Sequence, residues 1–223
     1  MEIRRLQLAR LRGPDGLEWP VHGFVIMHPA GPVLVDTGVG GPQHVLSDWR
    51  VVNRTAAEAL ADHDLAPGDI SLVINTHLHF DHCGQNAVFS KAAFYVQRAE
   101  LARSKREEPE LYDWFGFMNA RFELLDGDAE VLPGVSVITT PGHTEGHQCV
   151  VVGSDGDPAD LLIGDAAYTP RLYHGPADAK LPRGQASDLE SWRASVQRIK
   201  AVPAARVHFC HHADMAHNRP ADQ

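Results

Sequence analysis

Seven consecutive residues constrain this chain more than any other part of its sequence: Thr76-His77-Leu78-His79-Phe80-Asp81-His82. They directly follow residues 71–75 (SLVIN), a short continuous apolar run that is typical of a strand buried on both faces. The motif therefore lies at the carboxyl end of a strand, where α/β folds place their functional sites. Alternation in an extended segment points His77, His79 and Asp81 to one side, and His82 points away from that side. This arrangement predicts two imidazoles for one metal ion, and a carboxylate with an imidazole for a neighbouring ion.

Three other predicted strands also end at a residue that can bind a metal ion. Each of these residues is the first potential ligand after its strand: His143 after 135–140, Asp165 after 160–164 and His211 after 206–210. A carboxylate between two cations can bridge them with its two oxygens, and Asp165 is the natural candidate for that position. Four strand ends with ligand residues predict a shared metal centre.

The rest of the chain alternates between strand and helix patterns, which predicts an α/β fold with strands inside and helices outside. Further strands are predicted at 21–28, 32–36 and 148–153, and helices at 54–64, 97–107 and from the capping box Ser187-Asp188-Leu189-Glu190 to about residue 201. Residues 97–122 form either a lid or part of the core. With 223 residues, we expect a single domain over 1–223 with a short frayed tail after His217.

The composition excludes several classes of protein. A net charge of −9 argues against nucleic-acid and anionic-membrane surfaces, because both need a basic patch. No apolar run approaches the roughly 20 residues that span a bilayer. Three cysteines without CxxC spacing argue against a disulfide framework or a zinc ribbon. The first residues, MEIRRLQLARLRGPDG, are charged and lack the apolar region of a signal peptide, so we expect a cytoplasmic protein.

At the ligand motifs the sequence resembles the metallo-β-lactamase superfamily. The resemblance rests on HLHFDH, GHTEGH, a Gly-Asp pair after a strand and a late histidine, and it runs from about Val33 to His212. It implies a four-layer αββα sandwich that holds two metal ions. The implied ligands are His77, His79 and His143 for the first ion, Asp81, His82 and His211 for the second, and Asp165 bridging both. The family usually has His followed by Asp at the last position, which favours His211 over His212 without deciding between them.

The other histidines and one aspartate are expected to have lesser roles. The resemblance implies a structural role for His147 and a supporting role for Asp36 behind a metal-bound histidine. His208 lies within a predicted strand and is expected to be packed or half-exposed. Six scattered histidines are expected to be solvated: His22, His28, His44, His63, His174 and His217.

The implied ligand set points to hydrolysis. Histidine and carboxylate ligands suit Zn²⁺, and also iron or manganese. Two such ions lower the pKa of a shared water and produce a hydroxide that can attack a carbonyl or phosphorus. His79 stands where flavodiiron-type relatives have a glutamate, which disfavours oxygen reduction. No cysteine is among the expected ligands, which disfavours the antibiotic-hydrolysing branch that has one.

Tyr168, three residues after Asp165, narrows the expected substrate. In the N-acyl homoserine lactone lactonase branch, a tyrosine at that offset reaches the substrate carbonyl, and HLHFDHCG is similar to that branch. The resemblance implies a hydrolase that opens a small-molecule lactone or ester, with Asp81 moving the proton that the leaving alkoxide needs. Tyr168 could instead be a packed aromatic residue. A glyoxalase II-like thioesterase and a non-catalytic, metal-stabilised binding protein remain as alternatives.

Overall fold

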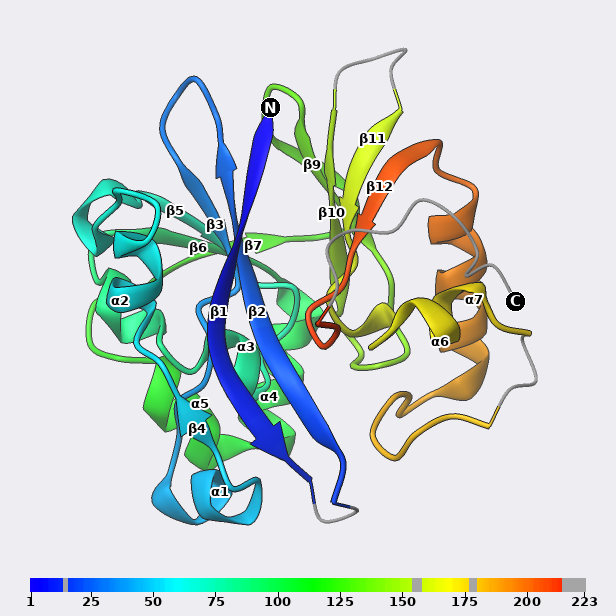
Figure 1. The fold of residues 1–223 in the computed structure, drawn as a ribbon, viewed down its shortest axis with the longest axis horizontal. Coiled ribbons are helices and arrows are strands. Elements are labelled where there is room, and N and C mark those ends of the chain that lie inside the picture. The colour runs from blue at the N-terminus through cyan, green and yellow to red at the C-terminus, as the bar shows by residue number, and fades with distance from the viewer. Residues whose placement is uncertain (14–15, 154–157, 177–179, 214–223) are drawn as a thin grey trace.

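Two β-sheets lie at the centre of the molecule, and the computed structural model describes residues 1–13, 16–153, 158–176 and 180–213 (Figure 1). Within these residues the first sheet has the strand order β4-β1-β2-β3-β5-β6-β7. Its strands are β1 (Glu2–Arg12), β2 (Glu18–Met27), β3 (Val33–Val35), β4 (Val52–Asn53), β5 (Leu72–Ile74), β6 (Ala93–Gln97) and β7 (Arg121–Leu125). The second sheet has the order β12-β11-β10-β9-β8. Its strands are β8 (Ala129–Leu132), β9 (Val135–Thr139), β10 (Gln148–Val152), β11 (Ala159–Leu162) and β12 (Ala204–His208).

Helices cover the outer faces of both sheets (Figure 1). On the side of the first sheet lie α1 (Gln43–Asp48), α2 (Ala56–Ala61), α4 (Arg98–Glu107) and α5 (Pro109–Phe115), and beside the second lie α6 (Pro170–His174) and α7 (Leu189–Lys200). The short α3 (Phe80–Cys83) and the 3₁₀ turns η1 (Pro67–Asp69), η2 (Asn86–Phe89) and η3 (Gly164–Ala166) complete the elements. This layer order confirms the predicted αββα sandwich. None of the helices in the described part of the chain is long and apolar enough to cross a bilayer.

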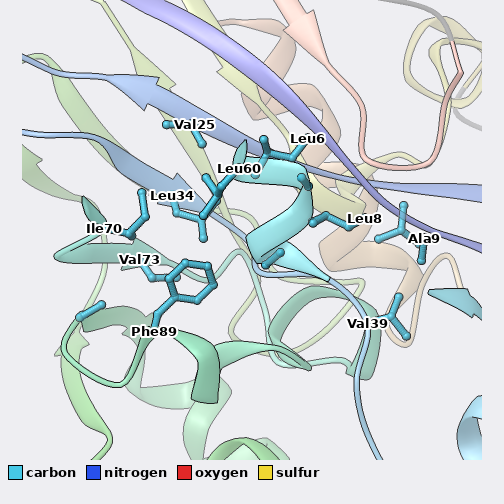
Figure 2. Close-up of a cluster of buried hydrophobic side chains, with 14 of the residues drawn as sticks. Leu6, Leu8, Ala9, Val25, Leu34, Val39, Leu60, Ile70, Val73 and Phe89 are labelled. Carbon is cyan, nitrogen blue, oxygen red and sulfur yellow. The ribbon is translucent and has the colours of Figure 1, made fainter. Parts of the chain in front are cut away.

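Apolar side chains fill the space between the sheets and the space under the helices. Phe24, Ile26 and Ile74 of the first sheet share one buried cluster with Val137 and Val150 of the second. Alternation along each strand turns the other face outward, toward the helices. There, Leu60 of α2 and Phe89 of η2 belong to a second buried cluster with Leu34 and Val73 (Figure 2).

Strand direction explains why the predicted ligand residues meet. Strands β3, β5, β6 and β7 are mutually parallel, so their carboxyl ends share one edge of the first sheet. In the second sheet β11 and β12 are parallel, and β9 runs in the same direction because both β9 and β11 are antiparallel to β10. The loops after β3, β5, β9, β11 and β12 therefore converge, which is the usual place for a site in such folds.

Several local predictions differ from the structure. The sequence did not predict strands β1, β4, β6, β7 and β8. Strand β1 buries Leu6, Leu8 and Leu11, but its many arginines and a bulge between Gln7 and Ala9 mask the alternation. The predicted helix 54–64 is the shorter α2, which begins after a capping box formed by Thr55 and Glu58. The tail predicted after His217 lies outside the described residues.

The structure also determines which residue caps α7 and how the segment 97–122 packs. Asp188, not Ser187, is the N-cap of α7 and accepts hydrogen bonds from the backbone of Glu190 and Ser191. Ser187 instead donates to the carbonyl of Gly142. Within 97–122, α4 and α5 bury Leu101, Leu111 and Phe115 against β6 and β7, so these helices are part of the core.

Candidate metal centre

Three imidazoles from two strand ends form the first group of candidate ligands, called here the first sub-site. The Nε2 atom of His77 lies 3.0 Å from Nδ1 of His79, and the Nε2 atom of His143 lies 3.2 Å and 3.0 Å from these two nitrogens. A tetrahedral zinc ion with bonds of about 2.0–2.1 Å would place its imidazole nitrogens about 3.3 Å apart. The observed spacing is therefore close to the spacing that one such ion needs.

The second sub-site contains Asp81, His82 and His211. The Nε2 atoms of His82 and His211 are 3.4 Å apart, and an oxygen of Asp81 lies 3.8 Å and 3.5 Å from them. Both histidines are buried; His82 lies in α3, after a strand of the first sheet, and His211 follows β12 of the second. His212, by contrast, points its ring toward Phe209, so the structure brings His211 and not His212 to this group.

Asp165 lies between the two sub-sites. Its Oδ2 atom is 3.3 Å from Nε2 of His143, and its Oδ1 atom is 3.1 Å from Nε2 of His211 and 3.3 Å from that of His82. The Oδ1 atom is buried and has no hydrogen-bond partner of acceptable geometry within the described residues. A buried oxygen without a partner is costly, so this position suits a cation. The seven residues predicted from the sequence thus lie in one cluster, with Asp165 in the middle.

Hydrogen bonds on the outer side of the second sub-site determine which ring nitrogens face its centre. The Nδ1 atom of His82 lies 2.8 Å from a carboxylate oxygen of Asp36, and that of His211 lies 2.9 Å from the carbonyl oxygen of Pro20. Because these oxygens only accept, each Nδ1 must carry the proton and donate it. When the rings are neutral, both Nε2 atoms therefore present lone pairs toward Asp165. Each of these nitrogens then faces a carboxylate oxygen that is also an acceptor, which is unfavourable unless a cation lies between them.

The first sub-site is oriented in the same way at two of its three histidines. His143 donates from Nδ1 to the carbonyl of Gln185 at 3.2 Å. The hydroxyl of Thr76 gives its proton to Asp36 at 2.8 Å, so it can only accept from Nδ1 of His77, at 3.1 Å. Both Nε2 atoms are then available for a metal, and Asp36 supports the centre as expected.

A cleft of about 780 Å³ opens above these side chains. Its lining includes His79, Asp81, His143, Asp165 and His211. It also includes the apolar Leu11, Trp19, Val45, Trp49 and Phe80 and the charged Asp48, Arg50, Glu108 and Arg183. Tyr168 lines the same cleft, with its ring centre 5.8 Å from that of His143 and 5.3 Å from that of His211. Burial and the nearby Asp165 and Asp81 raise the pKa of Tyr168, so it remains a phenol that can donate a hydrogen bond.

Comparison with known proteins identifies the family of this fold and ligand cluster. The sequence profile described as the metallo-beta-lactamase superfamily matches residues 17–211, a span that contains all seven clustered residues. The chain belongs to the metallo-beta-lactamase superfamily.

Within this superfamily the chain is similar to lactonases. An N-acyl homoserine lactonase from a Bacillus species is 31% identical over 201 residues, which cover 83% of this chain and 77% of that protein. The crystal structure of a quorum-quenching N-acyl homoserine lactone lactonase has a TM-score of 0.78 and 26% identity, and covers 94% of this chain and 91% of its own. An N-acyl homoserine lactone hydrolase with N-hexanoyl-L-homoserine bound at its catalytic metal centre has a TM-score of 0.74 and 25% identity, with the same coverage. The resemblance to the lactonase branch is therefore confirmed.

The two sub-sites differ in the direction in which their surroundings shift the pKa of the histidines. Burial lowers the pKa of His77, His79 and His143, and the neighbouring imidazoles add to this for His77 and His79. Burial acts in the same direction on His82 and His211, but Asp165 and Asp81 more than offset it and raise the pKa of both. The second sub-site therefore holds a positive charge more readily, whether that charge is a proton or a metal ion.

Several buried polar residues support the cluster, and some gave no sequence signal. His147 accepts from the backbone of Asp165 at 3.0 Å, which agrees with its expected structural role. Gln185 was missed: its amide donates to the carbonyl of Asp165 at 2.7 Å, and its amide oxygen accepts from the backbone of Tyr168 at 3.1 Å. His22, expected to be solvated, is buried and pairs with the carbonyl of Cys210, next to His211. Burial lowers the pKa of His22 to about 4.

Proposed function

We propose that this chain is a metal-dependent hydrolase that opens N-acyl homoserine lactones. The observation that carries the proposal is the position of the buried Asp165 at a cleft: its Oδ2 atom faces His143 of the first sub-site, and its Oδ1 atom faces His82 and His211 of the second. The lactonase relative and the product-bound neighbour support this substrate class.

We further propose that the centre holds two divalent ions, with zinc as the first candidate and iron or manganese as alternatives. The ligands would be the seven clustered residues, with Asp165 shared. When bound, two such ions lower the pKa of a water and take up charge that develops on the substrate carbonyl oxygen. Elemental analysis of protein purified without chelators should find close to two ions per chain. One ion or fewer would contradict the dinuclear centre.

The protein's own residues would supply proton transfer and orientation. Asp81 directs one oxygen toward the second sub-site and also lines the cleft, so its carboxylate can carry a proton to the leaving alkoxide. Tyr168 would donate a hydrogen bond from its phenol to the carbonyl oxygen as charge develops there. The apolar walls around Trp49 and Phe80 would hold the acyl chain and exclude water from it.

A substrate panel tests the proposal directly. Metal-loaded protein should open N-acyl homoserine lactones faster than it hydrolyses thioesters, β-lactams or phosphodiesters of similar size. Simple γ-lactones without an acyl chain should be weaker substrates, because they leave the apolar walls uncovered. Absence of ring opening for every lactone would reject the lactonase assignment. Preferential thioester cleavage would favour the glyoxalase II-like alternative, and binding without turnover would favour a binding protein.

A further inference from the structure

A buried carboxylate outside the ligand set connects the two loops of the first sub-site. Glu100, on α4, is fully buried. Its Oε1 atom accepts from the backbone N–H of Leu78 at 3.0 Å, and its Oε2 atom accepts from that of Gly146 at 3.1 Å. Leu78 lies between His77 and His79, and Gly146 follows His143 on the other loop. One side chain therefore reaches both ligand-bearing loops.

This connection is tight at both ends. A side chain at Gly146 would place its Cβ 2.2 Å from the backbone nitrogen of Glu100, so the glycine lets this loop rest directly on α4. One backbone hydrogen bond joins the bases of the two loops, from Gln148 to Thr76, and another closes the base of the loop that carries His143, from Thr140 to His147. Glu100 adds a second connection, from Leu78 between the two histidines of the first loop to Gly146 in the second loop.

Arg103 pairs with this carboxylate and orients it. It donates from two nitrogens to Oε1 of Glu100, at 3.1 Å and 2.9 Å, and from a third to Glu108 at 2.8 Å. Glu108 in turn lies 4.0 Å from the outer nitrogen of His79 and lines the cleft. The ion network thus runs from the buried side of α4 to His79. Among the described residues, the outer nitrogen of His79 contacts neither a carbonyl nor a hydroxyl, unlike those of His77 and His143.

We propose that Glu100 is a positioning residue that sets the distance between the two loops of the first sub-site and thereby its metal affinity. The inference rests on the proposed dinuclear centre. Supporting residues behind metal ligands typically change affinity by about 10–100-fold when they are altered. The effect of Glu100 should be confined to the first sub-site, because Leu78 lies between His77 and His79, whereas His82 of the second sub-site, further along the same loop, is held separately by Asp36.

The test compares Co²⁺ binding by the metal-free full-length wild type, Glu100→Asp and Glu100→Gln. Aspartate keeps the charge that Arg103 needs but is too short to reach both backbone N–H groups. Glutamine keeps the length, but its amide nitrogen faces one of those N–H donors. Competition with a chromophoric chelator should show one Co²⁺ weakened by about 10–100-fold in both variants and the other unchanged. The visible absorption of the weakened cobalt should change.

Asp160→Asn is the matched control, because Asp160 is a buried carboxylate that pairs with Arg206 and His208 away from both loops. This variant should lower thermal stability, but it should not weaken the binding of one Co²⁺ relative to the other. Adding His143→Ala to Glu100→Asp should leave one tight ion, and adding His211→Ala should leave none. Equal weakening of both ions in Glu100→Asp, or binding like that of the wild type, would overturn the proposal. A wild type that binds fewer than two ions would instead reject the dinuclear centre.

Discussion

The first and second sub-sites use the same ligand chemistry but are held in opposite electrostatic conditions. In the first, burial and neighbouring imidazoles keep the rings neutral, with the pKa of His77 and His79 well below its ordinary value. In the second, the carboxylates of Asp165 and Asp81 raise the pKa of His82 and His211 despite burial. A vacant second sub-site therefore attracts protons, whereas a vacant first sub-site does not.

The two sub-sites also differ in what orients them. His82 and His211 are enclosed and donate to Asp36 and to a backbone carbonyl of β2. His79 is 26% exposed at its side chain, and its outer nitrogen has only the more distant Glu108. Local hydrogen bonds thus determine the geometry of the second sub-site, and the first depends more on how far apart its loops are held.

The largest expected effect comes from Asp165→Ala, which removes the residue shared by both sub-sites. Affinity for both ions should fall by more than the about 10–100-fold that is typical of a supporting residue, because a direct ligand is lost. Zinc content after dialysis measures this. Loss of one ion with the other retained would show that Asp165 belongs to a single sub-site.

Asp81→Asn should separate chemistry from metal binding at the second sub-site. The amide keeps a ligand oxygen but cannot carry the proton, and a placed proton-transfer group contributes about 10²–10⁴ in rate. We expect kcat for the lactone to fall by about that factor while both ions remain. A thiolactone serves as control, since its leaving thiolate needs no proton and should be less affected. Near-normal lactone turnover would exclude this role for Asp81.

Asp36→Asn tests the orientation of the second sub-site. Asp36 has a positive φ of 59°, a conformation that asparagine tolerates, so the backbone should be preserved. The amide has one accepting oxygen, so it can accept either from the Thr76 backbone N–H, which meets Oδ1, or from the Thr76 hydroxyl and His82, which meet Oδ2, but not from both sets. Metal affinity of the second sub-site should fall by about 10–100-fold, with a smaller loss at the first through Thr76 and His77. Chelator competition measures both steps, and an effect confined to the first sub-site would contradict this assignment.

Tyr168→Phe should affect turnover without affecting either sub-site. The ring lies beside both His143 and His211, and its phenol is not among the proposed ligands of either sub-site. Removing one oxyanion donor typically costs about 10²–10³ in kcat, and a metal that shares the charge should reduce the loss to roughly tenfold or more. A lower kcat in steady-state kinetics, with unchanged metal content, would confirm the role. Unchanged kinetics would make Tyr168 a packing residue.

The smallest expected effect is a difference in pH dependence. Metal binding requires neutral imidazoles, and a raised pKa means that His82 and His211 take up protons at a higher pH than the ordinary value of 6.5. As pH falls toward about 6, the second sub-site should release its ion first. In the metal-free protein, low pH should instead increase the free energy of unfolding. The protonated His82 and His211 stabilise the folded state fully below pH 6.5, and this stabilisation is lost as pH rises through their raised pKa. Cobalt spectra and thermal melts against pH measure the two effects, and simultaneous release of both ions would contradict the first.

Sequence patterns predicted the elements that end at ligands better than the elements that surround them. Strands β5, β9, β11 and β12 have continuous or alternating apolar residues, and each ends near its predicted boundary. Strand β1 was missed because exposed arginines interrupt its buried positions, and β8 because it is short and half-buried. His22 was placed in solvent because a single histidine in an apolar strand carries no sign of the partner that it meets.

The sequence by itself determined the candidate ligands and their grouping at strand ends, because residue type and spacing are local properties of the chain. Only the tertiary structure decided which nitrogen of each ring faces the centre. The groups that orient the rings include backbone carbonyls of Pro20 and Gln185, which lie 191 and 42 residues from their histidines. Every residue has such a carbonyl, so no residue type marks it in advance. The same holds for Glu100, whose partners are two backbone N–H groups that only the packing of α4 brings within reach.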